Sequence, residues 1–147
     1  MSEKKVPKYL QPKENKRPSQ IENPEDRIKL PISWKFNRMV FDQNRKWNWC
    51  IPSKDNIIFA LKKLSDIENN TFFELIQSPK HHSYQISDLP EKSRNEFDKL
   101  RIYGHENIFS LRINGEPRVY CLYNKNEFSL LWLDLKHEVY PSHKKHT

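Results

Sequence analysis

The stretch from Ile108 to Tyr140, IFSLRINGEPRVYCLYNKNEFSLLWLDLKHEVY, decides the fold of this chain. It contains three runs rich in branched and aromatic residues, which are separated by Asn114-Gly115 and by Asn124-Lys125-Asn126. Short apolar runs divided by such turn residues are typical of antiparallel strands that follow one another in a meander. We therefore predict that this stretch forms the central sheet.

The length of the first turn decides which side chains share a face, because a slip of one residue in register turns a whole strand over. A two-residue turn at Asn114-Gly115 would place Arg112 and Arg118 on opposite faces. A three-residue loop from Asn114 to Glu116, with Gly115 at positive φ, would place them side by side. We favour this loop because it separates apolar from polar side chains. One face then carries Phe109, Leu111, Ile113, Val119 and Cys121, and the other carries Ser110, Arg112, Arg118 and Tyr120.

Two adjacent arginines repel each other unless an anion lies near them. In one interpretation each guanidinium pairs with a carboxylate such as Asp134 or Glu138, or faces water, as surface charges ordinarily do. In the other they form an anion site, since guanidinium is well shaped for phosphate. Asp134, His137 and Tyr140 follow the third run. An imidazole, a phenol and a carboxylate beside two arginines suit proton transfer and phosphate stabilisation, which favours the anion site.

The order of a leading strand, a helical middle and a C-terminal meander with LRINGEPRVY and LLWLDLKHEVY resembles the RelE/ParE superfamily of small bacterial toxins. The similarity covers about residues 32–140. The resemblance implies an α+β fold with an N-terminal strand, two or three helices and the meander. In the mRNA-cleaving branch, which includes RelE, YoeB and HigB toxins, strand arginines and a C-terminal histidine or tyrosine are site residues. The positions that match are Arg112, Arg118, His137 and Tyr140.

The mRNA-cleaving branch binds the ribosome and cuts mRNA in the decoding site, ParE-like members act on DNA gyrase, and antitoxins neutralise both kinds. The resemblance therefore implies a toxin of a type II toxin–antitoxin system. Its partners would be mRNA, the ribosome and a cognate antitoxin, and it would need no cofactor or metal. The alternative is a non-catalytic basic binding module, which inhibits gyrase or holds RNA or protein. The chain is longer than most such toxins, and its lysine-rich helix face is modest.

The implied reaction is attack by a ribose 2′-hydroxyl on the adjacent phosphate. In that reading Arg112 and Arg118 stabilise charge, while His137 and Tyr140 transfer protons or position the substrate. The supporting candidates are Asp134, which orients His137, together with Tyr120 and His82.

Composition limits the possibilities. A chain of 147 residues suits one domain, and its net charge of +7 favours an anionic partner, although a solvated basic surface is the alternative. The only cysteines, Cys50 and Cys121, lack CxxC spacing, and we read them as reduced core residues. We find no run of membrane-spanning length and no signal peptide, and expect a cytoplasmic protein. The only glycines, Gly104 and Gly115, cannot build a Walker-type or dinucleotide-binding loop.

Three segments follow from the pattern of polar and apolar residues. Residues 1–29 are rich in Lys, Glu, Asn and Pro, so we predict a disordered basic tail with a marginal short helix near Pro24 to Lys29. Residues 30–141 form the α+β domain, and residues 142–147 are a frayed basic C-terminus. The domain opens with a half-buried strand between Ile32 and Phe41, in which Ile32, Trp34 and Phe36 face inwards.

Two tryptophans, Trp47 and Trp49, follow that strand. We expect them to close over an edge of the core; the alternative is that they stack on bases. The adjacent His81 and His82 are predicted in a loop, where His82 is a candidate proton carrier. A zinc site that joins them to Asp134 and His137 is the weaker interpretation, because no second pair at ligand spacing follows.

Three helices are expected between the first strand and the meander. Ser53 caps the first, whose inward residues are Ile57, Ile58, Leu61, Leu64 and Ile67. Thr71 caps the second, Phe72 to Gln77, and Ser78-Pro79 ends it. The third begins near Ser87 or Asp88 with Pro90 in its first turn, stops by Gly104, and turns inwards Phe97, Leu100 and Ile102.

Overall fold

Five strands form one mixed sheet, in the order β1-β5-β4-β3-β2, in the computed structural model, which describes residues 24–141. The strands are β1 Ser33–Lys35, β2 His82–Gln85, β3 Asn107–Arg112, β4 Arg118–Asn124 and β5 Glu127–Asp134. Strands β3, β4 and β5 pair antiparallel, as the meander predicts. β2 adds antiparallel to β3, and β1 adds parallel to β5. The fold is α+β, as expected, and its meander carries an extra strand at each edge.

The three-residue loop between β3 and β4 is confirmed. Arg112 pairs with Arg118, and the Ile113 N–H donates to the Pro117 carbonyl at 3.0 Å, which leaves residues 114–116 as the loop. Gly115 has φ 67°, a left-handed conformation that glycine adopts without a side-chain penalty. The two arginines therefore lie side by side.

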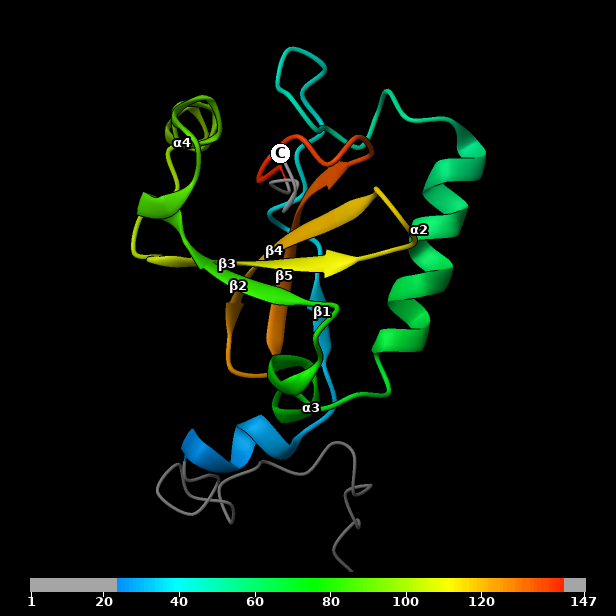
Figure 1. The fold of residues 1–147 in the computed structure, drawn as a ribbon, viewed down its shortest axis with the longest axis vertical. Helices are drawn as coiled ribbons and strands as arrows, with labels where there is room; N and C mark the ends of the chain where they lie inside the picture. Colours follow the sequence, from blue (N-terminus) through cyan, green and yellow to red (C-terminus); the bar gives the residue numbers. More distant parts are fainter. Residues whose placement is uncertain (1–23, 142–147) are drawn as a thin grey trace, which may run out of the picture.

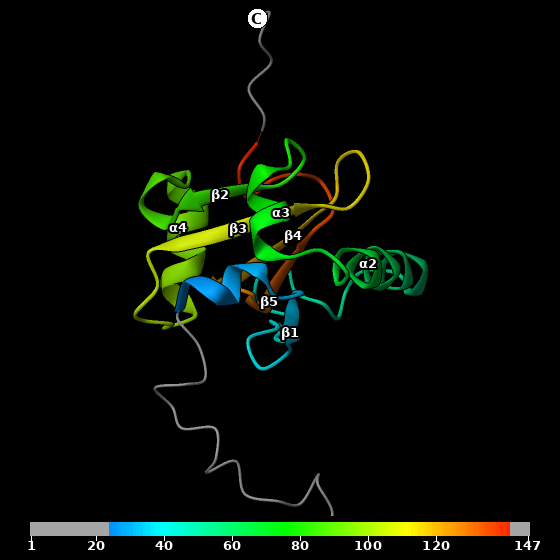
Figure 2. The same cartoon turned by 90° about the horizontal axis from the view of Figure 1, so that it is seen from below.

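Helices cover both faces of the sheet (Figures 1 and 2). Helices α2, Lys54–Ile67, and α3, Phe72–Gln77, lie on one face, and α4, Glu91–Lys99, lies on the other. The sheet side chains in the core under α2 and α3 are Phe109, Leu111, Val119, Cys121, Phe128, Leu130 and Leu133. Those in the core under α4 are Ile108, Tyr120, Leu122, Leu131 and Trp132. The sheet is thus buried on both sides along the meander.

Strand β5 contributes side chains to both cores by their alternation and carries a β-bulge at Leu131. Tyr120 pairs with Trp132 and Cys121 pairs with Leu130, so Leu131 is an extra residue without a partner on β4. The Leu131 carbonyl instead accepts hydrogen bonds from the Val40 N–H and the Trp49 indole, both at 3.1 Å. Residues 40–49 are thereby attached along the edge of β5 beyond the short β1.

The predicted helix starts are confirmed for α2 and α3. The Ser53 hydroxyl accepts the Asn56 N–H at 3.2 Å, and Thr71 and Glu74 form a reciprocal capping box. The predicted start of α4 at Ser87 or Asp88 is wrong. A short 3-10 turn, η4 Ile86–Asp88, comes first, and Pro90 occupies the N-cap position, so α4 begins at Glu91.

Several predicted side-chain positions are wrong. The inward stripe of α2 contains Ile57, Ala60, Leu64 and Ile67, while Ile58 and Leu61 are 39% and 45% exposed. A helix that packs on a sheet buries the apolar residues of one side only. Helix α2 has more apolar residues than fit on that side, so some of them face outwards. Phe36 is 61% exposed because β1 ends at Lys35.

Three further expectations need correction. His82 opens β2 and does not lie in a loop, because its polar segment pairs through its backbone with β3 as an edge strand. Cys50 is exposed, and only Cys121 is buried. The tail prediction lies outside the described residues up to position 23, but Pro24–Lys29 forms the 3-10 helix η3, where Arg27 donates to the Asn124 carbonyl at 3.2 Å. The predicted C-terminal segment 142–147 also lies outside the described residues.

Candidate functional site

The paired arginines stand at the end of β3 and the start of β4, with Arg112 exposed and Arg118 half-buried. Within residues 24–141, none of the ion pairs joins either arginine to Asp134 or Glu138. Asp134 does lie opposite Arg118 in the register of β4 and β5. The interpretation in which each guanidinium is neutralised by a carboxylate is therefore not found in the structure.

Arg118 is held in one orientation by its own hairpin. Its Nη1 donates to the carbonyls of Gly115, Glu116 and Pro117, the last two at 2.8 and 3.1 Å. These contacts use one nitrogen, so Nε and Nη2 have no hydrogen-bond partner in the described part of the chain. Burial and then the charge of Arg112 lower the pKa of Arg118, but a guanidinium stays protonated at neutral pH. It is an oriented cation with an open edge for an anion.

His81 fixes the backbone at the other arginine. Its Nδ1 accepts the Arg112 N–H at 3.1 Å, and the ring is 8% exposed. Burial is the main reason that the pKa of His81 falls to about 4, and electrostatic interaction with Lys63, His82, Lys80 and Arg118 lowers it further. The ring is neutral at pH 7 and can only accept at Nδ1. Sequence reasoning missed this role, since nothing in the His81-His82 pair shows which ring turns inwards.

Asp134 acts on His137 through the backbone of the loop at residues 135–141, which we call the C-terminal loop. Its fully buried carboxylate accepts the Glu138 N–H at 2.9 Å and the Val139 N–H at 2.8 Å. Burial raises the pKa of Asp134, and these two N–H groups oppose that rise. His137 has φ 58°, a left-handed conformation that histidine tolerates better than most residues. Asp134 is therefore a buried loop anchor.

The electrostatic surroundings keep His137 neutral. Burial and then the charge of Arg118 lower its pKa, while Asp134 opposes them. The ring is half-buried and close enough to Arg118 for the guanidinium charge to lower its pKa. A neutral imidazole near two arginines is available to accept a proton at neutral pH.

Tyr140 joins the site through a second tyrosine. Its ring stacks on that of Tyr84 at 4.1 Å and 16°, and the Ser93 hydroxyl donates to the Val139 carbonyl at 2.6 Å, which ties the C-terminal loop to α4. Burial and then Tyr140 raise the pKa of Tyr84, whereas Arg118 lowers it. Tyr84 was not among the candidates, although its place between polar residues in HSYQ is the signal of a strand residue turned inwards.

Of the remaining candidates, His82 stays near the site and Tyr120 does not. His82 is exposed on β2, with its ring 6.0 Å from that of Tyr84. Tyr120 is fully buried, and burial raises its pKa. It is a core residue beneath the arginines and has no access to a substrate. We call the group Arg112, Arg118, His137, Tyr84 and Tyr140 the arginine cluster.

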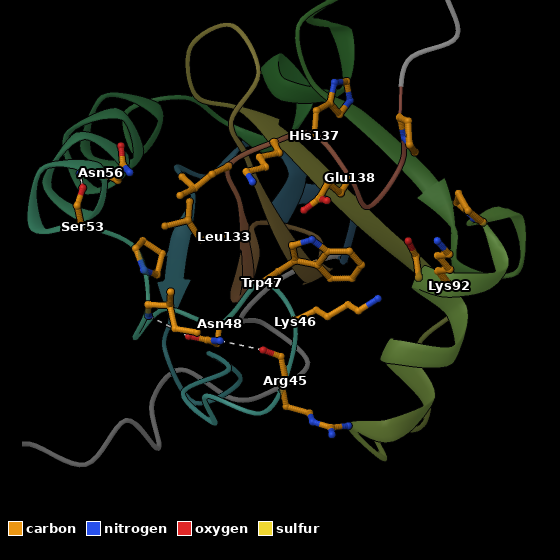
Figure 3. A pocket seen from close by; sticks show the side chains of 17 residues that line it. Arg45, Lys46, Trp47, Asn48, Ser53, Asn56, Lys92, Leu133, His137 and Glu138 are labelled. Atoms are coloured by element: carbon orange, nitrogen blue, oxygen red, sulfur yellow. Dashed lines mark hydrogen bonds between the residues drawn. The ribbon is translucent and has the colours of Figure 1, made fainter.

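A cavity of about 990 Å³ adjoins the arginine cluster at His137. Its walls come from residues 45–49, which we call the tryptophan loop, from the N-terminal ends of α2 and α4, and from the C-terminal loop. Figure 3 shows Trp47 among these side chains, with Lys46 next to it and His137 and Glu138 across the cavity. The basic lining residues are Arg45, Lys46, Lys92 and Lys136.

Two further findings concern cofactors and membranes. Within residues 24–141, no three side chains among His, Cys, Asp and Glu are placed to hold a metal ion. In the same part of the chain, no helix combines the length and the apolar character needed to cross a membrane.

Comparisons with protein-family models, with curated proteins and with solved structures find no match for this chain.

Proposed function

We propose that this chain is a RelE/ParE-like toxin of a type II toxin–antitoxin system and acts as a ribosome-dependent mRNA endoribonuclease. One observation carries the proposal: Arg112, Arg118, His137 and Tyr140 gather at one end of the α4 face, and no carboxylate of the described residues pairs with the arginines. Arginines that form no ion pair with a carboxylate of the described residues, beside a neutral imidazole, suit the charge and proton transfers of RNA cleavage.

The chemistry starts with attack of a ribose 2′-hydroxyl on the adjacent phosphorus. His137 takes the hydroxyl proton, since its pKa is lowered and the ring is neutral. Arg112 and Arg118 stabilise the charge on the phosphorane, Arg118 with its open Nε and Nη2 edge. The 5′-oxygen leaves with a proton, and a 2′,3′-cyclic phosphate remains. The stacked Tyr140 and Tyr84 hold the nucleotide beside the reacting phosphate, and either phenol is close enough to the cluster to return a proton.

The arrangement of elements also supports the proposal. Arginines on the first two strands of the meander and a histidine just after the third are what the resemblance to the RelE branch implies. Strand β2 and the tryptophan loop are additions to the expected arrangement of a leading strand, helices and a C-terminal meander. β2 supplies Tyr84 to the cluster, and the tryptophan loop lines a cavity together with His137.

A second candidate is a toxin that binds a protein target without catalysis, as ParE-like members do with gyrase. Three apolar side chains on the outer side of α2 favour it: Ile58, Phe59 and Leu61 are 39%, 46% and 45% exposed. Exposed apolar patches of this kind mark protein contacts. The same face would equally suit a cognate antitoxin. It therefore distinguishes the protein-binding toxin from the nuclease less clearly than the arginine cluster does.

The test is tightly controlled expression in bacteria, with growth curves and maps of mRNA 5′ ends. Arg112→Ala is the cleaner arginine variant, because the hydrogen bond of Arg112 to His81 is made by the backbone N–H, and its side chain makes no hydrogen bond within residues 24–141. His137→Asn removes the titrating ring but keeps a residue that tolerates positive φ. Arg38→Ala, an exposed arginine in the turn after β1, is the matched control. Circular dichroism of each purified variant checks folding.

Growth arrest with new cuts inside translated messages, lost in Arg112→Ala and His137→Asn but kept in Arg38→Ala, is the expected result. Arrest without cuts would remove the nuclease and favour the protein-binding candidate. A folded protein that causes no arrest would remove toxicity as the function.

A further inference from the structure

We propose that the cavity beside His137 is a nucleotide-binding subsite for single-stranded RNA, which holds the nucleotides next to the phosphate at the arginine cluster. The inference rests on the proposed function and adds to it a binding site and a substrate form. Its evidence lies in the charge of the cavity, the fixed position of Trp47 and the continuity with the arginine cluster.

The cavity is cationic. Lys46, Lys92 and Lys136 line it from three different elements, and no ion pair within residues 24–141 involves any of them. Arg45 is partly engaged, with its Nε 4.0 Å from a Glu96 carboxylate oxygen. Among the lining residues that the structure describes, Glu138 is the only acid. Three lysines around one hollow attract an anionic polymer such as the phosphate backbone of a nucleic acid.

Trp47 gives the cavity an aromatic wall that the backbone holds in place. Its φ of 56° is a conformation that bulky residues rarely adopt. On either side of this residue the chain is fastened, since the Leu133 N–H donates to the Trp47 carbonyl at 3.0 Å and the Lys46 N–H donates to buried Glu96 at 3.0 Å. The indole packs edge-on against Trp132 at 4.9 Å. The structure thus maintains an unfavourable backbone conformation that keeps this ring in the cavity wall.

The rest of the tryptophan loop is also preformed. The buried Asn48 side chain accepts the N–H groups of Cys50 and Ile51 at 2.9 and 3.0 Å and donates to the Arg45 carbonyl at 2.8 Å. A wall that is already ordered before binding loses little conformational entropy when a ligand arrives. The cavity is therefore built for occupation without rearrangement.

Lysines and an indole ring in the wall of one cavity favour single-stranded RNA as the ligand. Every nucleobase has a face that stacks on an aromatic ring, and this face is free only when the base has left a duplex. A volume of about 990 Å³ is ample for one nucleotide and for part of the next. His137 belongs both to the cavity wall and to the arginine cluster, so a strand with its phosphate at Arg118 would reach the cavity past His137. An acidic protein segment fits the lysines but makes no particular use of the indole.

The experiment measures the binding of a dye-labelled single-stranded RNA of about 12 nucleotides to the purified full chain by fluorescence anisotropy across a salt series. The cavity variant combines Lys46→Ala, Lys92→Ala and Lys136→Ala. The matched control combines Lys29→Ala, Lys35→Ala and Lys62→Ala, three exposed lysines outside the cavity lining. Both lose the same charge, so any difference between them belongs to the cavity. Thermal melts confirm that both are folded.

We expect the cavity variant to bind at least about tenfold more weakly at physiological salt, with a salt slope smaller by about 2, because each single-strand phosphate contact contributes about 0.7. The control should lose less than about threefold, since dispersed surface charge acts only through a screened field. In a second measurement, RNA that contains 4-thiouridine is irradiated on the wild-type protein. The crosslink should map to the peptide that contains Trp47.

Equal weakening in the two variants, or crosslinks confined to peptides outside the cavity, would overturn the inference. Wild-type protein that binds no RNA at low salt would overturn it as well and would favour an acidic protein segment as the occupant. The proposed function is judged separately, by cuts in cellular mRNA. Cavity-dependent binding without cuts would keep the subsite and remove the nuclease, whereas cuts with cavity-independent binding would do the reverse.

Discussion

Acidification should loosen the backbone at the arginine pair through His81. Its Nδ1 accepts the Arg112 N–H at 3.1 Å, so protonation would place a second hydrogen opposite a donor. The new charge would also be buried near Lys63, Lys80, His82 and Arg118. Burial and then the surrounding charges explain the low pKa of His81. The Arg112 N–H, which needs an acceptor at Nδ1, adds to the preference of the folded protein for the neutral ring.

The size of the effect follows from the two pKa values. The pKa of His81 is about 4 in the folded protein and 6.5 in a solvated histidine. A folded-state pKa below the unfolded one gives stability that is present above pH 6.5 and is lost as the pH falls towards 4. Between about pH 7 and about pH 4.5 the loss comes to roughly 2 kcal/mol of unfolding free energy.

Urea unfolding, followed by circular dichroism across this pH range, measures that loss. The comparison is with His81→Asn, whose side-chain oxygen can still accept the Arg112 N–H but does not titrate. Other carboxylates and histidines titrate in both proteins, so the difference between the two pH profiles belongs to His81. Parallel profiles for wild type and His81→Asn would refute the reasoning and show that the ring is solvated or already charged.

Three further predictions concern local structure. Asp134→Asn replaces one of the two carboxylate oxygens by an amide group, so the Val139 N–H faces a donor in place of an acceptor. The free energy of unfolding in urea should fall by about 1–3 kcal/mol. An unchanged free energy would contradict the role of Asp134 as the anchor of the C-terminal loop. Ser53→Ala removes the N-cap of α2 and should cost about 1 kcal/mol, visible as a lower Tm, unless water replaces the cap without loss. A thiol reagent should modify Cys50 in the native protein and Cys121 only in denaturant, and rapid modification of both would contradict the buried position of Cys121.

The meander and the register of its first hairpin could be predicted from the sequence because both depend on neighbouring residues. The three-residue loop at 114–116 followed from the alternation of apolar and polar side chains on β3 and β4. The caps at Ser53 and Thr71 were equally local. In each case the residues that decide the structure lie within a few positions of it.

The parts that could not be predicted depend on contacts between distant segments. Strand β2 is short and polar and exists because β3 offers its backbone groups. The bulge at Leu131 has meaning only once residues 40–49 are bound along β5. For the same reason the sequence placed Arg112, Arg118, His137 and Tyr140 near one another but missed Tyr84 and His81, which reach the cluster from β2 and the residue before it.

The parallel pairing of β1 with β5 sets the order of events during folding. Ser33 pairs with Glu127, a separation of 127 − 33 = 94 residues, and this contact joins the first strand to the last. At about 5–20 residues per second, a ribosome needs about 5 to 19 s to make that stretch. Before β5 is made, the sheet is incomplete. The segments of α2 and α3 are therefore synthesised before the sheet face on which they pack in the folded protein. We expect slow closure of the sheet after release from the ribosome, with the exposed helix faces of the nascent chain as the surface that a chaperone would bind.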